Sequence, residues 1–135
     1  MVAIEPSSSA IRIAQELFPK ADFPNIEWKL GFAEKELKSF HVDGPVCFVT
    51  ACVLSHLTDD AVKKICQQIN IIAPKGSILG FAECWGPESH NFMWHIRTQS
   101  WWQRQFPGWE LDFYGPNIQD VAGRHKGFHG VRIKG

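Results

Sequence analysis

The most constraining feature of this sequence is a continuous apolar run, Val46–Leu57, followed by a helical pattern and a second apolar run, Ser77–Ala82. The first run is rich in Val, Phe and Cys and lacks helical spacing, which predicts a central strand buried on both faces. Thr58 is a good N-cap, and apolar residues then recur at three- and four-residue spacing until Pro74 and Gly76 end the helix. Together these segments predict a βαβ unit in a parallel sheet that helices cover on each side.

Further elements are predicted on both sides of this unit. Upstream, the sequence predicts a strand over 1–5 that ends in an acid, a helix over 10–18 and an alternating edge strand over 24–30. Downstream, it predicts a helix over 92–106, strands over 109–114 and 130–133, and a long Gly-rich loop over 115–129.

Length and composition exclude several classes of protein. A chain of 135 residues predicts one domain. The 14 basic and 14 acidic side chains balance, so the overall charge does not indicate a nucleic-acid partner. No apolar run approaches the ~20 residues that cross a bilayer, and the first residues do not form a signal peptide. Four cysteines lie in or beside the most apolar segments without zinc-site spacing, so we expect small buried side chains, a cytoplasmic location and no metal.

Five short segments carry a family resemblance. In chain order they are VAIEPS (2–7), IAQELFP (13–19), GFAEKEL (31–37), VLSHLTDD (53–60) and IAPKG (72–76). Their order and spacing resemble those of a class I S-adenosylmethionine-dependent methyltransferase that starts at its second strand. The resemblance implies an α/β fold, a Rossmann-like three-layer sandwich with a mostly parallel sheet. It also implies S-adenosylmethionine as cofactor and a small-molecule acceptor.

The resemblance assigns a cofactor site and also shows two departures from the family. Glu5 matches the acid that binds the ribose hydroxyls, and Phe32 and Ala33 match the adenine region, although Phe32 replaces the acid that often contacts adenine. The family's first strand and glycine-rich loop have no counterpart before Met1. Three interpretations therefore stay open. The chain is a methyltransferase-like protein, active or inactive alone, or a non-catalytic module that binds a ligand or self-associates, or a module whose tryptophan-rich helix binds a partner protein.

The absent strand is central in the family's sheet. Its loss predicts either an altered strand order, with 1–5 paired directly to 46–54, or a homo-oligomer joined through open strand edges.

Four residues, three near the predicted carboxyl ends of strands and one in the predicted helix over 92–106, are candidates for the acceptor side. His56 is a candidate general base and Glu83 a candidate catalytic acid, although either side chain could simply close a strand or face solvent. Trp85 and Trp94 are candidate walls of an acceptor pocket within a tryptophan-rich segment that otherwise predicts packing.

The remaining polar residues predict no site. His90 and His95 are five apart, and His125 and His129 fall in the Gly-rich loop, so neither pair shares a helix face. Arg97 and the other basic residues of the last third predict scattered, solvated charges.

Overall fold

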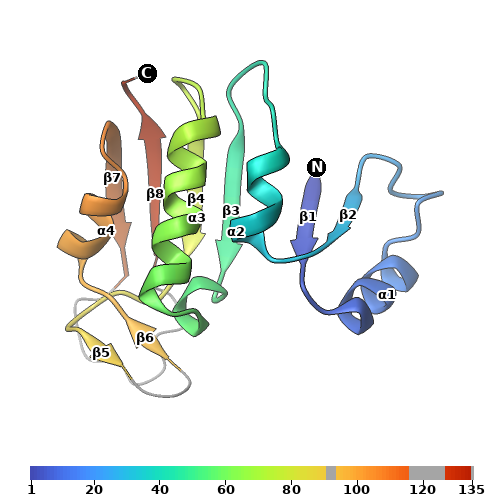
Figure 1. Ribbon diagram of the computed structural model, residues 1–135, viewed down its shortest axis with the longest axis horizontal. Helices are drawn as coiled ribbons and strands as arrows, with labels where there is room; N and C mark the ends of the chain where they lie inside the picture. The colour runs from blue at the N-terminus through green and yellow to red at the C-terminus, as the bar shows by residue number, and fades with distance from the viewer. Residues whose placement is uncertain (91–93, 116–126, 135) are drawn as a thin grey trace. The chain divides into compact units, whose positions relative to one another are not determined.

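The computed structural model describes residues 1–90, 94–115 and 127–134. Its packing divides the chain into two compact units, Met1–Phe40 and His41–Gly135, which are described separately (Figure 1). We call them the N-terminal and C-terminal units. The expectation of a single domain stays a prediction.

The N-terminal unit contains two parallel strands, β1 (Val2–Glu5) and β2 (Glu27–Leu30), joined by helix α1 (Ser8–Leu17). The Ser7 hydroxyl accepts a hydrogen bond from the Ala10 amide at 3.2 Å, which is why α1 starts there. A short helix α2 (Ala33–Glu36) and a 3-10 turn η1 (Leu37–Ser39) follow β2.

The C-terminal unit is built on one four-stranded sheet. Its strands are β3 (Cys47–Ala51), β4 (Ile78–Ala82), β8 (Gly127–Arg132) and β7 (Trp109–Tyr114), in that spatial order. β3 and β4 are parallel and α3 (Asp59–Ile72) connects them, so the predicted βαβ unit is confirmed. β8 is antiparallel to both neighbours, so β3, β4 and β7 share one direction and the sheet is mostly parallel.

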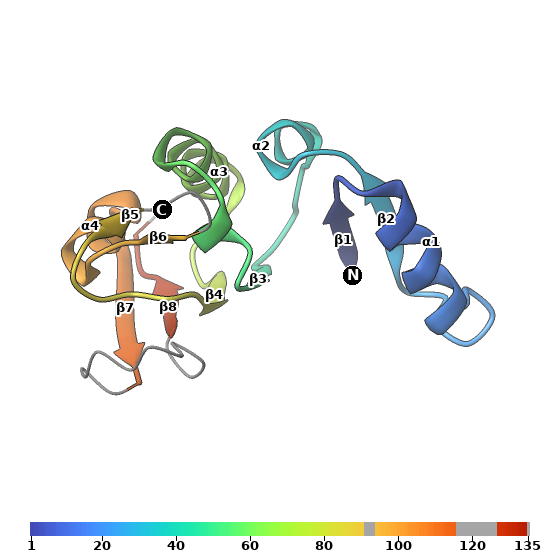
Figure 2. The same ribbon diagram turned by 90° about the horizontal axis from the view of Figure 1, so that it is seen from below.

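Helices α3 and α4 (Gln99–Gln105) cover the same face of this sheet (Figure 2). Between helices and sheet lies a core in which Phe81 contacts the rings of Trp102, Phe106 and Phe128 at centroid distances of 5.2–6.5 Å. Burial of these large side chains is the main force that holds the unit together.

The burial predicted for β3 on both faces is wrong. Val49 is 72% exposed, and Cys47 and Ala51 are exposed beside it. Within the described residues β3 pairs only with β4, and the helices of this unit cover the opposite face. Cys47 and Cys52 are therefore exposed instead of buried, whereas Cys66 is buried as expected.

The strand predicted from the apolar run Val46–Leu57 is also too long. β3 stops at Ala51 because Cys52 adopts a positive φ of 54°, and a 3-10 turn, η2 (Leu54–His56), leads into α3. Thr58 caps that helix through its hydroxyl, as predicted.

The predicted helix over 92–106 is wrong in its first half. Thr98 is the N-cap of α4, because its hydroxyl accepts from the Trp101 amide at 3.1 Å. Before it, β5 (Ser89–His90) and β6 (His95–Ile96) form a short antiparallel hairpin, with 91–93 outside the described residues. The final strand starts earlier than predicted, at Gly127, and most of the predicted loop, including His125, also lies outside them.

The altered strand order is not found among the described sheets. β1 and β2 form a sheet of their own, and β3 is the end strand of the four-stranded sheet. The predicted homo-oligomer stays a prediction. Of the helices described, none is both long and apolar enough to span a bilayer.

Candidate functional site

The candidate site of the C-terminal unit lies where β3 and β4 end together. Ala51 and Ala82 are register partners at the carboxyl ends of these parallel strands. The Cys52 amide donates to the Ala82 carbonyl at 2.9 Å, and its left-handed backbone turns the chain sharply away from the strand. A non-glycine residue in this conformation is uncommon, and local hydrogen bonds must hold the turn in place.

Glu83 supplies those hydrogen bonds. Its carboxylate is fully buried and accepts from three successive amides, those of Val53, Leu54 and Ser55, each at 3.1 Å. The Ser55 hydroxyl donates a fourth bond at 2.9 Å. A carboxylate used in this way satisfies the unpaired amides at the start of η2. Its catalytic role stays a prediction, but the geometry gives it a positioning role beneath the turn.

Arg97 holds the same turn from the other side and is not the solvated charge that the sequence predicted. The side chain is buried, and its guanidinium donates to Asp59 at 2.8 Å, to the Leu54 carbonyl at 2.9 Å and to the Leu57 carbonyl at 2.7 Å. The guanidinium also lies 5.0 Å from the Trp101 ring centroid, a cation–π contact. A fourth bond goes to the nearby His95 carbonyl at 3.3 Å. No sequence motif marks this residue, because its partners Asp59, Leu54 and Leu57 are about forty positions away.

His56 and Trp94 are brought together by this arrangement. Their ring centroids are 4.3 Å apart with an interplanar angle of 44°. His56 is exposed at the end of η2, while Trp94 immediately precedes β6 and is half-buried. The pair therefore offers an imidazole and an indole at the rim where ligands of α/β proteins bind.

Trp85 does not present its indole in the same way. It is 4% exposed, and its N–H donates to the carbonyls of Tyr114 and Gly127 at 3.1 and 3.0 Å. The ring also packs edge-on against Phe113. Its substrate-binding role stays a prediction, and the observed contacts are those of a core residue that ties the loop after β4 to β7 and β8.

The N-terminal unit carries the residues expected to bind the cofactor. Glu5 ends β1, and its carboxylate accepts from the Ser7 amide at 2.8 Å. Its register partner is Leu30, so the turn to Phe32 begins beside it, where the Gly31 amide donates to the Glu5 carbonyl. Phe32 is 52% exposed with the Lys35 ammonium 5.6 Å from its ring centroid, and Ala33 starts α2.

These residues fit the adenosine half of S-adenosylmethionine and leave its other half without a cradle. A carboxylate at a strand end can accept from two vicinal hydroxyls, and an exposed phenyl ring can stack on adenine. In the described part of the chain no strand is followed by a G-x-G turn that would admit the methionine half.

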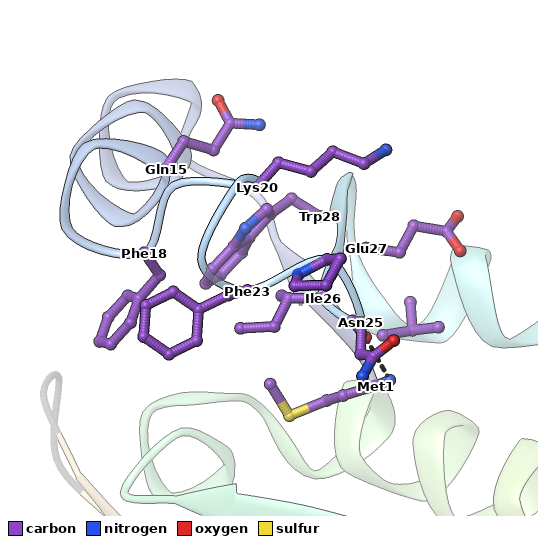
Figure 3. Close-up of a pocket in the computed structure, with 11 residues that line it drawn as sticks. Met1, Gln15, Phe18, Lys20, Phe23, Asn25, Ile26, Glu27 and Trp28 are labelled. Carbon is purple, nitrogen blue, oxygen red and sulfur yellow. Dashed lines mark hydrogen bonds between the residues drawn. The ribbon is translucent and has the colours of Figure 1, made fainter.

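A pocket of about 640 Å³ also lies in the N-terminal unit, and the sequence analysis missed it. Figure 3 shows Phe18, Phe23, Ile26 and Trp28 gathered around it with Met1 at its edge. Val2 begins β1 with Met1 directly before it, whereas Glu5 ends the strand, so the pocket lies at the opposite end of the strand from the candidate ribose ligand. No residue predicted to bind cofactor lines it.

Comparison with known proteins defines the fold. Neither a protein-family model nor a curated protein sequence matches. Solved structures do match: the SAM-bound amino pentose methyltransferase CalS10 from Micromonospora echinaspora is 11% identical with a TM-score of 0.65, over 97% of this chain and 73% of its own. A SAM-dependent methyltransferase from Methanosarcina mazei is 16% identical with a TM-score of 0.68, over 96% of this chain and 79% of its own.

The chain therefore has the Rossmann-like fold of class I SAM-dependent methyltransferases, as the sequence resemblance predicted. At such low identity the likeness shows the fold alone. A structure described as a pericyclic reaction enzyme matches equally well, with a TM-score of 0.68 and 14% identity over 99% of this chain and 36% of its own. Fold does not fix the reaction, so activity and acceptor must be argued from the site.

Proposed function

We propose that the protein is a SAM-dependent methyltransferase that acts on a small-molecule acceptor. The observation that supports this most is the fold itself, which nearly the whole chain shares with methyltransferases of known structure. The cytoplasmic location expected from the sequence remains part of this proposal.

Each candidate residue has a different role in this proposed reaction. Bound S-adenosylmethionine would supply an electrophilic methyl group. Glu5 would accept hydrogen bonds from the ribose hydroxyls and Phe32 would stack on the adenine. His56 would take the proton that the acceptor loses, and Trp94 would orient both the imidazole and the acceptor.

Calorimetric titration with S-adenosylmethionine tests the proposal. We expect heat of binding that Glu5→Ala abolishes and that Glu27→Ala leaves unchanged, because Glu27 lies at the other end of the parallel strand pair. Circular dichroism controls for folding. If the folded protein gives no heat at millimolar cofactor, the methyltransferase proposal is wrong; if Glu5→Ala retains affinity, only the ribose assignment is wrong.

A second candidate function is self-association without catalysis. It is supported by β3, which pairs only with β4 in the part of the chain that the structure describes. The strand carries no charged residue, and its exposed side chains are Cys47, Val49 and Ala51. Open edges of this kind recruit other strands unless charges or proline block them. Light scattering tests this candidate, and a strictly monomeric protein at high concentration would reject it.

A further inference from the structure

Two histidines outside the candidate site meet across the β5–β6 hairpin. His90 and His95 are register partners on its two strands, and their Nδ1 atoms are 2.9 Å apart. The sequence search for metal ligands missed them because it tested helix spacing, whereas residues directly opposite each other on antiparallel strands have neighbouring side chains.

Glu88 fixes the proton positions of this pair. Its Oε1 lies 2.9 Å from His90 Nε2, so the hydrogen-bond network assigns a proton to that nitrogen. Neutral His90 then keeps a lone pair on Nδ1, and His95 must donate to it through its own Nδ1–H. A histidine that is oriented by a carboxylate on one nitrogen, with a lone pair on the other, has the arrangement of a metal ligand.

We propose that His90 and His95 form a two-histidine binding site for a divalent transition-metal ion such as Zn²⁺, with water completing the coordination. Binding requires the His95 proton to move from Nδ1 to Nε2, with no net gain or loss of protons by the neutral pair. A tetrahedral ion about 2.0–2.1 Å from both nitrogens needs them roughly 3.3 Å apart, a small opening of the present contact.

The surroundings leave room for the water ligands. The His90 side chain is 37% exposed and that of Glu88 is 65% exposed. No cluster of three or more His, Cys, Asp or Glu side chains able to hold a metal exists among residues 1–90, 94–115 and 127–134. With two protein ligands we therefore expect a Kd on the order of 10 μM, weaker than that of a four-ligand structural site.

Titration of the full chain with ZnCl₂ by calorimetry tests the site. We expect one binding event that His90→Gln or His95→Gln weakens at least about tenfold, because each removes one of two ligands. His41→Gln is the matched control, since His41 is exposed and contacts only Asp43 among the ion pairs described. Glu88→Gln should weaken binding by up to about tenfold without abolishing it.

Chemical modification keeps the test decisive if a variant fails to fold. In the unmodified protein, Zn²⁺ should slow carbethoxylation of His90 and His95 and leave His41 unaffected, as measured by peptide mapping. Zinc binding that persists in both glutamine variants, absence of binding at millimolar Zn²⁺, or lack of selective protection would overturn the site and leave a hydrogen-bonded imidazole pair. Mg²⁺, which prefers oxygen ligands, should not compete.

Discussion

Replacing Glu83 with Gln tests whether the buried carboxylate holds the turn after β3. The substitution keeps the shape of the side chain but converts one acceptor oxygen into a donor NH₂ group. If that group takes the place of Oε2, it meets the Ser55 amide and hydroxyl, both of which now donate to Glu83. The hydroxyl can rotate to accept from the new NH₂, but the Ser55 amide cannot and is left unsatisfied.

The expected loss in free energy of unfolding follows from the number of hydrogen bonds that Glu83→Gln removes or weakens. Hydrogen bonds to charged groups contribute about 1.5–3 kcal/mol each, and a buried unsatisfied amide costs about 1–3 kcal/mol. Since one bond is lost outright and the others lose their charge assistance, we expect Glu83→Gln to lower the free energy of unfolding by about 3 kcal/mol. That is a large part of the roughly 5–15 kcal/mol typical of a domain.

Urea unfolding followed by tryptophan fluorescence measures this loss through the shift of the midpoint at constant m-value. Glu110→Gln is the matched control, since it makes the same change on an exposed residue of β7 and should stay within about 0.5 kcal/mol of the parent. Hydrogen exchange should also accelerate at the amides of Val53, Leu54 and Ser55. If Glu83→Gln is as stable as Glu110→Gln, the positioning role is wrong.

Three further predictions concern separate features. Arg97→Lys should lower stability by about 3 kcal/mol in the same assay, because an ammonium cannot reproduce the four hydrogen bonds that the buried guanidinium donates; unchanged stability would contradict it. Val49→Lys should abolish any self-association detected by light scattering and leave stability nearly unchanged, because this side chain is 72% exposed. In a thiol assay of the folded protein Cys52 should react quickly and Cys66 only after unfolding. Burial raises the pKa of the Cys66 thiol from 9.0 to about 12. The unfolded chain therefore loses this proton first, so the contribution of Cys66 to the free energy of unfolding is complete below pH 9 and is lost as the pH rises towards 12. Cys66→Ala should lack that loss.

Local signals predicted the framework well. Thr58 caps α3 where its hydroxyl predicted, and the periodic apolar residues between Thr58 and Pro74 form that helix. Of the serines 7–9 that precede the other predicted helix, Ser7 is the cap. Each of these features depends on neighbours within one or two turns of helix, which a single sequence contains. The positive φ of Gly76, in the turn before β4, was predictable for the same reason.

Features that depend on distant partners were not predictable. The apolar run 46–57 indicated burial on both faces, but exposure of Val49 is decided by which strands pair with β3. Similarly, no residue close to Arg97 in the sequence predicts its ion pair with Asp59, which lies 38 positions earlier. The hairpin that joins His90 to His95 replaced a predicted helix because Thr98, and no earlier residue, caps α4.

The four residues predicted for the acceptor side show the same limit most clearly. His56, Glu83 and Trp85 belong to the ends of predicted strands and Trp94 to a predicted helix, and the sequence alone did not show which of them are buried. Long-range bonds separate them: Glu83 and Trp85 direct their polar atoms to backbone groups about thirty to forty positions away and are buried. His56 and Trp94 contact each other by their rings, and His56 is exposed. Substitutions at Glu83 or Trp85 would therefore change stability together with any activity, so urea unfolding must accompany each activity measurement on such a variant.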